Sequence, residues 1–331
     1  MNVFVTGGAG YCGSLLVPKL LAEGHKVTVY DIMYFGSAFY QPHENLTLIK
    51  GDIRNADLIE QSAANHDMFI SLACISNDAS FELDEDLSTS VNLDAFEPMV
   101  IAAKNAGCRR FIYASSSSVY GVSDQKDVTE DHPLVPLTLY NKYKGMCEPL
   151  LKKHTDSNFI GVIFRPATVC GYAPRLRLDL SVNILTNHAI NKNKITVFGG
   201  DQLRPNLHVE DYCDAVMLLM GAPAEKVADE TFNVGFENMS ILNIAEIVKT
   251  VVEEEFPEKA PIEIVTTESN DNRSYHINSD KITRVLGYKP SRSIQEAVHD
   301  LCKAFKEDKI PNSFDNDIYF NVKRLLNQQA S

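Results

Sequence analysis

The start of the chain places a short apolar strand, a glycine-rich turn and an amphipathic helix in immediate succession. Gly7, Gly10 and Gly13 lie in the turn at three-residue intervals, between apolar residues 2–6 and a helical pattern over residues 14–23. Glycines at this spacing let the backbone turn sharply and approach a pyrophosphate, while the N-terminus of the following helix faces the anion. Because the glycines stand between a strand and a helix, they predict a dinucleotide-binding site.

A carboxylate at the end of the next predicted strand indicates which dinucleotide binds. This strand covers residues 26–30 and is followed by Asp31, eighteen residues after Gly13. A carboxylate at this place hydrogen-bonds to ribose hydroxyls and repels a 2′-phosphate, so it favours NAD over NADP. The alternative is that Asp31 is an ordinary solvated residue at the end of a strand.

Predicted strands and helices alternate through the first half of the chain, which is typical of βαβ units on a parallel sheet. Further strands are expected at residues 46–50, 68–72, 110–114 and 159–164, and helices at residues 56–64, 90–106 and 139–154. We therefore predict an α/β fold with a Rossmann-type, doubly wound parallel sheet and a smaller C-terminal substrate-binding domain.

The composition of the sequence changes after residue 165, where turn-rich segments that carry arginine and asparagine begin. We predict an NAD-binding domain over residues 1–165 and a mainly substrate-binding domain over residues 166–331. Two later stretches, residues 211–220 and 231–234, have the pattern of core elements. The two domains are therefore expected to be interleaved.

Composition limits the partners and the location. The chain has 331 residues, an apolar fraction of 44% and a formal net charge of −13. This charge argues against a broad nucleic-acid interface, which needs clustered positive charge. We find neither an apolar run that could span a bilayer nor a cleavable leader, so we expect no membrane partner and a cytoplasmic location. The polar tail after residue 308 is expected to be partly mobile.

The seven cysteines are scattered through the chain, without the Cys-x-x-Cys or mixed Cys/His spacing of metal sites. We expect them to be reduced and mostly buried, where they act as small apolar residues. No metal ion is expected.

Tyr140 and Lys144 lie four residues apart on a predicted helix and follow a run of four serines at residues 115–118. Residues at i and i+4 share a helix face, and an ammonium beside a phenol lowers a phenol pKa that is otherwise about 10. Such a tyrosine can act as a general base toward an alcohol. The spacing alone is a weak signal, because Tyr319 and Lys323 repeat it without a preceding serine run.

Taken together, these motifs resemble the extended short-chain dehydrogenase/reductase family, in its nucleotide-sugar epimerase/dehydratase branch. The matching motifs run in order over nearly the whole chain: the opening glycines, Gly51-Asp-Ile-Arg54, Ser71-Leu-Ala-Cys74, the serine run with Val119-Tyr-Gly121, Tyr140-x-x-x-Lys144 and Arg204-x-x-x-His-Val-Glu-Asp211. The resemblance implies NAD as cofactor and a nucleotide-diphosphate sugar as substrate.

The resemblance also implies a homodimer. The predicted helices at residues 90–106 and 139–154 resemble the pairs that form the dimer seam of relatives. Phe96, Met99 and Val100 fit an apolar face on the first of these helices, although the same face could be plain core.

Roles for individual residues follow from the same resemblance. The catalytic residues are expected to be Ser116, Tyr140 and Lys144. The cofactor-binding residues are expected to be Gly7, Gly10, Tyr11, Cys12, Gly13, Asp31, Ile32, Asp52, Ile53, Leu72, Ala73, Asn92, Tyr140 and Lys144. The substrate-binding residues are expected to be Ser116, Ser117, Thr168, Arg204 and Arg273. In the family, Asp52 and Ile53 match the pair that meets the adenine, and Asn92 matches an asparagine that steadies the loop near the cofactor.

Four of these assignments have ordinary alternatives. Asp52 could cap a turn, and Asn92 could be a polar helix residue that bonds locally. Arg204, which matches a clamp on the nucleotide diphosphate, could be a paired or solvated surface charge. The serine run could be a polar loop.

Three positions depart from the patterns of particular family members. The 4,6-dehydratases carry an Asp-Glu pair where this chain has Ser117 and Ser118, so a dehydratase is less expected. Reductase-epimerases of the fucose-synthase type carry a cysteine at the place of Ser118. The 4-epimerases usually carry an asparagine at the place of Thr168, so the sugar or the nucleotide is expected to differ from the common UDP-hexose.

The reading that fits best is an NAD-dependent oxidoreductase acting at C4 of a nucleotide sugar, as a 4-epimerase with a transient 4-keto intermediate. A C4 dehydrogenase or 4-keto reductase without epimerisation is the alternative. A non-catalytic dinucleotide-binding sensor is a third possibility, against which the intact set of Ser116, Tyr140 and Lys144 argues.

Overall fold

The computed structural model describes residues 1–123, 125, 127–268 and 274–329. Its strands are β1 (Asn2–Thr6), β2 (Lys26–Asp31), β3 (Leu46–Lys50), β4 (Met68–Ser71), β5 (Arg110–Ala114), β6 (Ile160–Pro166), β7 (Thr168–Cys170), β8 (Lys194–Phe198), β9 (Leu203–His208), β10 (Thr231–Val234), β11 (Glu237–Ser240) and β12 (Glu263–Thr267). Its α-helices are α1 (Gly13–Ala22), α2 (Ala56–Ala63), α3 (Asp78–Phe81), α4 (Glu85–Thr89), α5 (Phe96–Asn105), α6 (Leu139–Lys153), α7 (Ser181–Lys192), α8 (Val209–Gly221), α9 (Ala224–Val227), α10 (Ile241–Glu255), α11 (Asp280–Leu286), α12 (Ile294–Lys306) and α13 (Asn321–Gln329). Short π or 3₁₀ turns are η1 (Ser90–Asp94), η2 (Ser117–Tyr120), η3 (Pro257–Lys259) and η4 (Asp317–Tyr319).

In the part of the chain that the structure describes, seven parallel strands form the main sheet in the order β10-β6-β5-β4-β1-β2-β3. The chain moves outward from β1 through β2 to β3 and then returns to the other side of β1 at β4. At such a reversal the connections leave in opposite directions, so a crevice opens at the carboxyl ends of the two strands. The predicted doubly wound sheet is confirmed, and this crevice is where a ligand is expected.

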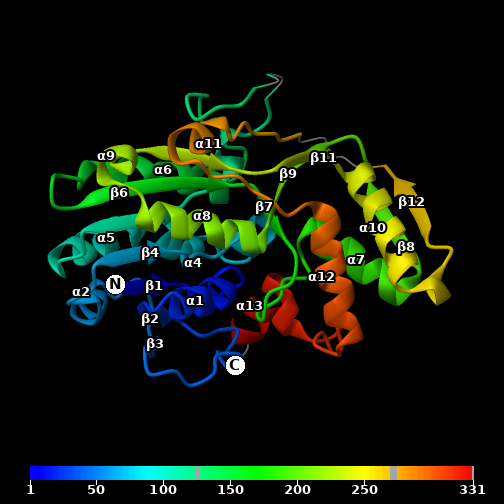
Figure 1. The fold of residues 1–331 in the computed structure, drawn as a ribbon, viewed down its shortest axis with the longest axis horizontal. Helices are drawn as coiled ribbons and strands as arrows, with labels where there is room; N and C mark the ends of the chain where they lie inside the picture. The colour runs from blue at the N-terminus through cyan, green and yellow to red at the C-terminus, as the bar shows by residue number, and fades with distance from the viewer. Residues whose placement is uncertain (124, 126, 269–273, 330–331) are drawn as a thin grey trace.

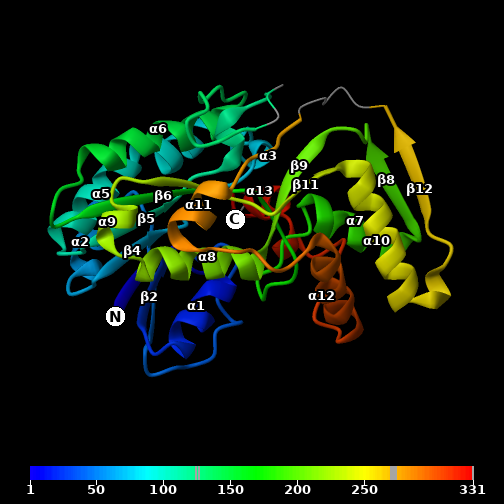
Figure 2. The same ribbon diagram turned by 45° about the horizontal axis from the view of Figure 1, so that its top comes forward.

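Helices cover both faces of the main sheet (Figures 1 and 2). α1 and α8 pack together on one face, whereas α2, α5 and α6 lie on the other. Because both faces are covered, the central strands are largely apolar: Phe4, Phe69 and Phe111 are fully buried, and the rings of Phe69 and Phe111 stack with their centres 4.8 Å apart. Burying a ring of this size contributes about 1.5–3 kcal/mol, so the sheet is a firm base for the loops at its carboxyl edge.

The second half of the chain forms a smaller unit and also returns to the main sheet. β7, β9 and β11 make a three-stranded sheet, and β8 pairs with β12. α7, α10 and α12 pack around an apolar cluster on the right of Figure 1. β10 pairs with β6 in the main sheet, so the chain crosses back as the patterns at residues 211–220 and 231–234 indicate. The domain boundary at residue 165 stays a prediction.

Two segments differ from what the sequence predicts. Residues 90–106 contain the π-helical turn η1 before α5 begins, rather than one continuous helix. Phe96, Met99 and Val100 are at most 4% exposed, so they belong to the core and not to a free face. The C-terminal tail is not loose where it is described: Tyr319 is buried, and α13 packs against α3 between the main sheet and the smaller unit (Figure 1).

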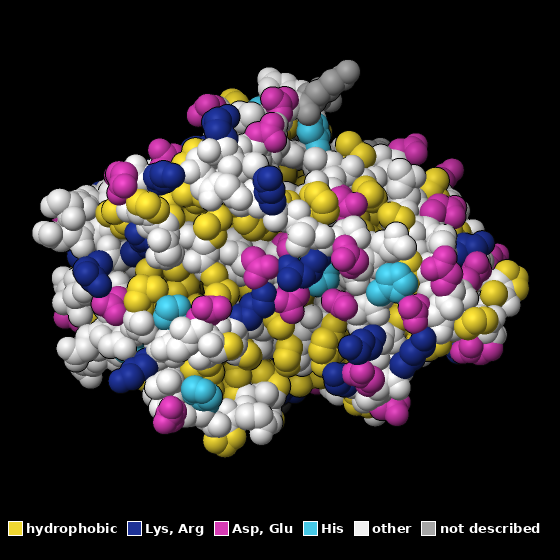
Figure 3. All heavy atoms as spheres, viewed as in Figure 1, with side chains coloured by type: hydrophobic (Ala, Val, Ile, Leu, Met, Phe, Trp, Pro, Cys, Tyr) yellow, Lys and Arg dark blue, Asp and Glu magenta, His cyan; other side chains and the backbone are white. Residues whose placement is uncertain are grey.

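The surface and the side chains of the described residues add four observations. We find no helix there with the length and hydropathy to span a membrane, and no group of three or more His, Cys, Asp or Glu side chains placed to ligate a metal ion. All seven cysteines are free thiols, as predicted. On the face in Figure 3, basic and acidic side chains are interspersed rather than gathered by sign.

Candidate functional site

A cavity of about 490 Å³ opens at the carboxyl ends of β1, β4 and β5. Residues from most of the predicted motifs line it: Gly7, Gly10, Tyr11, Cys12, Gly13, Asp31, Ile32, Asp52, Ile53, Leu72, Ala73, Ser116, Ser117, Tyr140, Lys144, Thr168 and Arg204. Asn92 stands behind the wall rather than in it, and Arg273 lies outside the described residues. The fold therefore brings side chains from distant parts of the sequence to one place.

The glycine turn makes the floor of this cavity and leaves no room for side chains. Gly7 has a φ of +73°, and a Cβ there would lie 2.5 Å from the backbone nitrogen of Ala73. A Cβ on Gly13 would lie 2.2 Å from the carbonyl oxygen of Gly8, so α1 packs against the turn only because this residue is glycine. The residue before α1, Cys12, makes no side-chain hydrogen bond to the helix, and the first turn of α1 carries no acidic residue. The helix N-terminus thus fits an anionic group such as a dinucleotide diphosphate.

Asp31 closes one side of the glycine turn. Its two carboxylate oxygens accept hydrogen bonds from the backbone N–H groups of Ala9 at 3.0 Å and Met33 at 2.7 Å. Burial raises the pKa of Asp31, and the two N–H donors oppose this shift. Each carboxylate oxygen keeps a further lone pair for a ribose hydroxyl.

Asp52 lines the cavity as predicted and also stabilises a turn, which is the ordinary alternative for this residue. It accepts hydrogen bonds from the backbone N–H of Arg54 at 2.9 Å and from the guanidinium of Arg54 at 2.5 to 3.0 Å. Hydrogen bonds from Arg54 lower the pKa of this carboxyl below its ordinary value. Asp52 therefore organises the turn after β3 and faces the cavity at the same time.

Asn92 acts on the cavity through the loop after β4. Its Oδ1 accepts from the N–H of Ile75 at 2.9 Å, and its Nδ2 donates to the carbonyl oxygen of Ile75 at 2.8 Å. Ile75 itself lines the cavity. The side-chain amide of Asn92 thus pairs with the backbone of Ile75 as a neighbouring strand would, and it holds the loop in place. Asn92 belongs to the π-helical turn η1.

The serine run divides between the cavity and the core behind it. Ser116 N-caps the 3₁₀ turn η2, and its Oγ lies 2.7 Å from that of Ser118, which donates to Asn141 Oδ1 at 2.5 Å. Ser115 points the other way and donates to Glu148 Oε1 at 2.7 Å. The stretch is therefore an ordered wall and not a loose polar loop.

Behind this wall lies a buried polar network, which we define as Ser115, Glu148, Arg165 and Tyr120. Arg165 Nε and Nη2 donate to the two oxygens of Glu148 at 2.9 and 2.6 Å, and Arg165 Nη1 donates to the hydroxyl of Tyr120 at 2.6 Å. The Glu148 and Arg165 side chains are 6% and 7% exposed. The network ties α6 to β5 and β6, and so fixes the helix that carries Tyr140.

Tyr140 and Lys144 both reach the cavity from α6, but they do not pair as the spacing predicts. Lys144 Nζ donates to the carbonyl oxygen of Ala114 at 2.7 Å and lies over the ring of Tyr113. Burial raises the pKa of Tyr140, and the principal opposing charge is that of Arg177. The predicted lowering of the tyrosine pKa by the lysine is therefore wrong for this structure, because the strand-end carbonyl holds the ammonium and the phenol is buried.

The cavity lining also includes polar residues that the sequence analysis did not predict, among them Arg175, Arg177 and Asn321. Arg177 forms a bidentate pair with Asp179, with donor to acceptor distances of 2.8 and 3.2 Å. The Arg-x-Arg spacing in the turn-rich segment after β7 is a signal that could have been used. Asn321 gave no signal, because it belongs to the tail that the sequence predicts to be loose.

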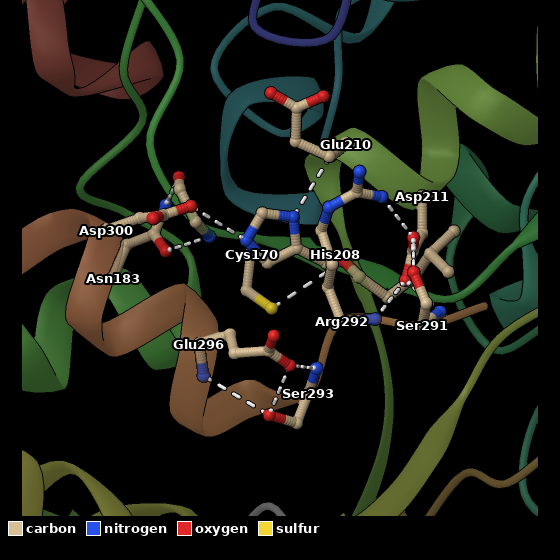
Figure 4. Close-up of polar contacts among 12 residues, drawn as sticks. Cys170, Asn183, His208, Glu210, Asp211, Ser291, Arg292, Ser293, Glu296 and Asp300 are labelled. Carbon is tan, nitrogen blue, oxygen red and sulfur yellow. Dashed lines mark hydrogen bonds and ion pairs between the residues drawn. The ribbon is translucent and has the colours of Figure 1, made fainter.

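The second half of the Arg204-x-x-x-His-Val-Glu-Asp motif supports the cavity from outside. His208 caps the start of α8, and Asp300 Oδ2 on α12 lies 3.2 Å from its Nε2. Asp211 accepts from the backbone N–H groups of Ser291 at 3.0 Å and Arg292 at 2.8 Å, and from the Arg292 guanidinium at 2.6 Å. Figure 4 shows His208 facing Asp300 and Arg292 beside Asp211. These contacts join the end of β9 to α12, and β9 carries the arginine of the motif.

Comparison with known proteins finds one family that matches most of the chain. The model of the NAD dependent epimerase/dehydratase family matches residues 3–235. The chain is 28% identical to the low-salt glycan biosynthesis protein Agl12 of Haloferax volcanii, over 90% of this chain and 96% of that protein. It is 25% identical to a dTDP-glucose 4,6-dehydratase of Actinoplanes sp., over 93% of this chain and 99% of that protein. The fold is similar to that of a UDP-glucose 4-epimerase from Thermotoga maritima crystallised with UDP-glucose, with a TM-score of 0.83 and 22% identity over 93% of this chain and 99% of that one.

Proposed function

The chain belongs to the NAD dependent epimerase/dehydratase family, and from this premise we propose that it epimerises a nucleotide sugar at C4 through a transient 4-keto sugar. It is an NAD-dependent enzyme that acts on nucleotide sugars. Relatives include both a dehydratase and proteins linked to epimerisation by name, so the decision rests on the residues around the reacting carbon.

The observation that carries the proposal is the set of side chains on the wall next to Tyr140. Ser116 and Ser117 line the cavity there, and the hydroxyl of Ser118 is held by Asn141. Elimination of water needs a carboxylate or another acid and base at the sugar. With serines at both positions that follow Ser116, this wall offers hydroxyl groups that can orient a carbonyl, and neither position supplies the carboxylate that an elimination needs.

NAD, when bound, supplies a hydride acceptor at the carbinol carbon and returns the hydride, so it is not consumed. The glycine turn, Asp31 and the N-terminus of α1 would hold it, and the fit of this turn to an anion supports that assignment. Lys144 would bind ribose hydroxyls while it keeps its bond to Ala114.

Tyr140 is the residue that we assign to proton transfer. It takes the proton of the C4 hydroxyl as the carbonyl forms and gives it back when the alcohol is restored. Its pKa is raised by burial, so a nearby cation is needed for this work; Arg177 already acts in that direction. Ser116 donates a hydrogen bond to the same oxygen and stabilises the charge that develops on it.

We assign substrate binding to Thr168 and Arg204, which line the cavity; Arg273, the second expected clamp, lies outside the described residues. The Arg204 guanidinium carbon lies 5.1 Å from the centre of the Tyr275 ring, and Nη1 donates to the carbonyl oxygen of Leu203 at 2.9 Å. A planar guanidinium that lines the cavity is the kind of donor that suits a diphosphate. Thr168 lines the wall beside the serines and would contact the sugar.

The test combines one variant with one product analysis. Wild-type enzyme incubated with NAD and a panel of sugar nucleotides should yield a C4 epimer, seen by NMR, without net change in NADH absorbance. Tyr140→Phe should lower turnover by at least about 100-fold, the usual size of a lost acid–base group, while NAD binding measured by calorimetry is retained. A 4-keto-6-deoxy product would replace the proposal with a dehydratase, net NADH formation would replace it with a dehydrogenase, and an active Tyr140→Phe variant would remove the catalytic assignment.

We also propose that the enzyme is a homodimer built on the outer faces of α5 and α6. These helices pack on one another, and Ile101 and Met146 on them are 40% and 42% exposed. Analytical ultracentrifugation should give a dimer for the wild type and a monomer for Ile101→Glu. A monomeric wild type at micromolar concentration would contradict this assembly.

A further inference from the structure

Arg175 is a buried cation that forms no ion pair with any of the described residues. Its side chain belongs to the segment between β7 and α7, and the residue is 3% exposed. Nη2 donates to Asn321 Oδ1 at 2.5 Å, and the guanidinium carbon lies 3.5 Å from the centre of the Phe35 ring. Its Nε is buried and has no hydrogen-bond partner among the described residues. Arg175 also lines the cavity.

The two nearest carboxylates are already engaged. Asp179 accepts the bidentate hydrogen bonds of Arg177. Asp31 accepts hydrogen bonds from the backbone N–H groups of Ala9 and Met33. Burial, and then the positive charge of Arg177, lower the pKa of Arg175 to about 9. A buried guanidinium that lacks a paired anion is destabilising, so its retention is explained best by an anion that a ligand brings.

The position of Arg175 selects the ligand. Its backbone N–H donates to Ser14 Oγ at 3.1 Å, in the first turn of α1. Arg175 therefore lies beside the start of this helix, its side chain interacts electrostatically with that of Cys12, and both residues line the cavity together with Gly10. A helix N-terminus attracts negative charge by its own N–H groups and dipole.

We propose that Arg175 binds the diphosphate of the dinucleotide cofactor, opposite the N-terminus of α1. The proposal rests on the dinucleotide site of the proposed function and adds a contact from outside the glycine turn. Asn321, at the start of α13, aims the guanidinium through its Oδ1 and is itself held by a bond from its Nδ2 to Ser76 Oγ at 2.8 Å. The C-terminal segment thereby positions a cofactor contact.

The test measures binding and stability, not turnover. Calorimetry of the full chain, stripped of nucleotide, compares ADP-ribose, adenosine, UDP, NAD and NADP for the wild type and Arg175→Met. Methionine keeps an unbranched side chain against Phe35. We expect ADP-ribose to bind about 10- to 100-fold more weakly, the effect of losing a charge-assisted hydrogen bond, while the dissociation constants of adenosine and UDP stay within about twofold. Because an unpaired buried charge is removed, the apo variant should melt at the wild-type temperature or above it.

Arg110→Met is the matched control. Arg110 donates to the backbone carbonyls of Leu219, Met220 and Ala222 at 2.6, 2.7 and 2.8 Å and does not line the cavity. It should lower the melting temperature and leave ADP-ribose binding unchanged.

Four results would overturn the inference. Unchanged ADP-ribose affinity in Arg175→Met would remove the contact, and a lower apo melting temperature with unchanged affinity would assign Arg175 to structure alone. A loss confined to UDP would move the contact to the substrate diphosphate, and a larger loss for NADP than for NAD would move it to a 2′-phosphate. ADP-ribose binding requires no turnover, so a failure of the epimerase proposal, read from the NMR assay, is distinguishable from each of these.

Discussion

Removing one partner of the Glu148–Arg165 ion pair should destabilise the protein far more than breaking a pair on the surface. The two side chains are almost fully buried and are joined by two parallel hydrogen bonds of 2.9 and 2.6 Å. Burial by itself lowers the pKa of Arg165, but the hydrogen bonds and charge of Glu148 outweigh it and raise the pKa above its ordinary value. A guanidinium is not deprotonated in proteins at ordinary pH, so Arg165 stays a cation when its partner is gone.

Glu148→Gln leaves that cation without a counter-charge, and the loss of one partner of a buried pair costs about 3–5 kcal/mol. The glutamine carbonyl can still accept one of the bonds from Arg165 or Ser115, so we expect the lower end, about 3 kcal/mol. This is a large share of the roughly 5–15 kcal/mol that separates folded from unfolded protein. Replacing both residues, as in Glu148→Leu with Arg165→Met, removes both charges and should return stability to within about 1 kcal/mol of the wild type.

Urea denaturation of the wild type, Glu148→Leu, Arg165→Met and the double variant gives the coupling free energy directly, with Glu148→Gln measured beside them. Lys153→Met is the matched surface control, because its ammonium pairs with Glu97 at 2.8 Å while its side chain is 65% exposed; its loss should be below about 1 kcal/mol. The reasoning fails if Glu148→Gln costs no more than this control, or if the double variant is as unstable as the single ones.

Two further predictions concern backbone strain and pH. Gly7→Ala and Gly24→Ala both place alanine at positive φ, +73° and +78°, at a cost of about 1–2 kcal/mol each. Only at Gly7 does the new Cβ also lie 2.5 Å from a backbone nitrogen, so urea denaturation should show the larger loss of stability for Gly7→Ala. Equal losses for the two variants would contradict the effect of this contact. Burial raises the pKa of Asp214, but hydrogen bonds from Lys19 and Arg292 outweigh it and leave the pKa below its ordinary value. This carboxylate therefore stabilises the folded state above about pH 4, and the contribution is lost as the pH falls through the lowered pKa. Asp214→Asn should be less stable at pH 7 and should lose less stability on acidification; parallel pH profiles would argue against this linkage.

The parts of the site that the sequence predicts are those fixed by local geometry. The glycine turn, the serine run and the i, i+4 pair on α6 depend on a few neighbouring residues, so their spacing is enough to place them. The pKa of Tyr140 could not be predicted in this way. Its direction depends on how deeply the ring is buried and on which acceptor holds Lys144, and both are set by β5 and by the loops around the cavity.

The contact between Arg175 and Asn321 could not be predicted from the sequence either. The two residues are 146 positions apart in the sequence, and neither lies in a motif with a regular period. Asn321 stands in a polar segment whose composition indicates mobility, yet η4 and α13 fold against the cavity through Tyr319 and α3. Contacts of this kind are determined by how distant elements close over one another, which a pattern along the chain does not encode.

The return of β10 to the main sheet bears on how the protein is made. While the ribosome is still producing the smaller unit, β6 has an open edge, and its Val162 and Phe164 side chains, which end at 0% exposure, lack part of their cover. Open strand edges and exposed apolar side chains favour aggregation. A nascent chain would therefore be prone to aggregate until residues 231–234 emerge, and a fragment cut at residue 165 would keep that open edge permanently. The dinucleotide-binding half would then be difficult to isolate as a stable protein.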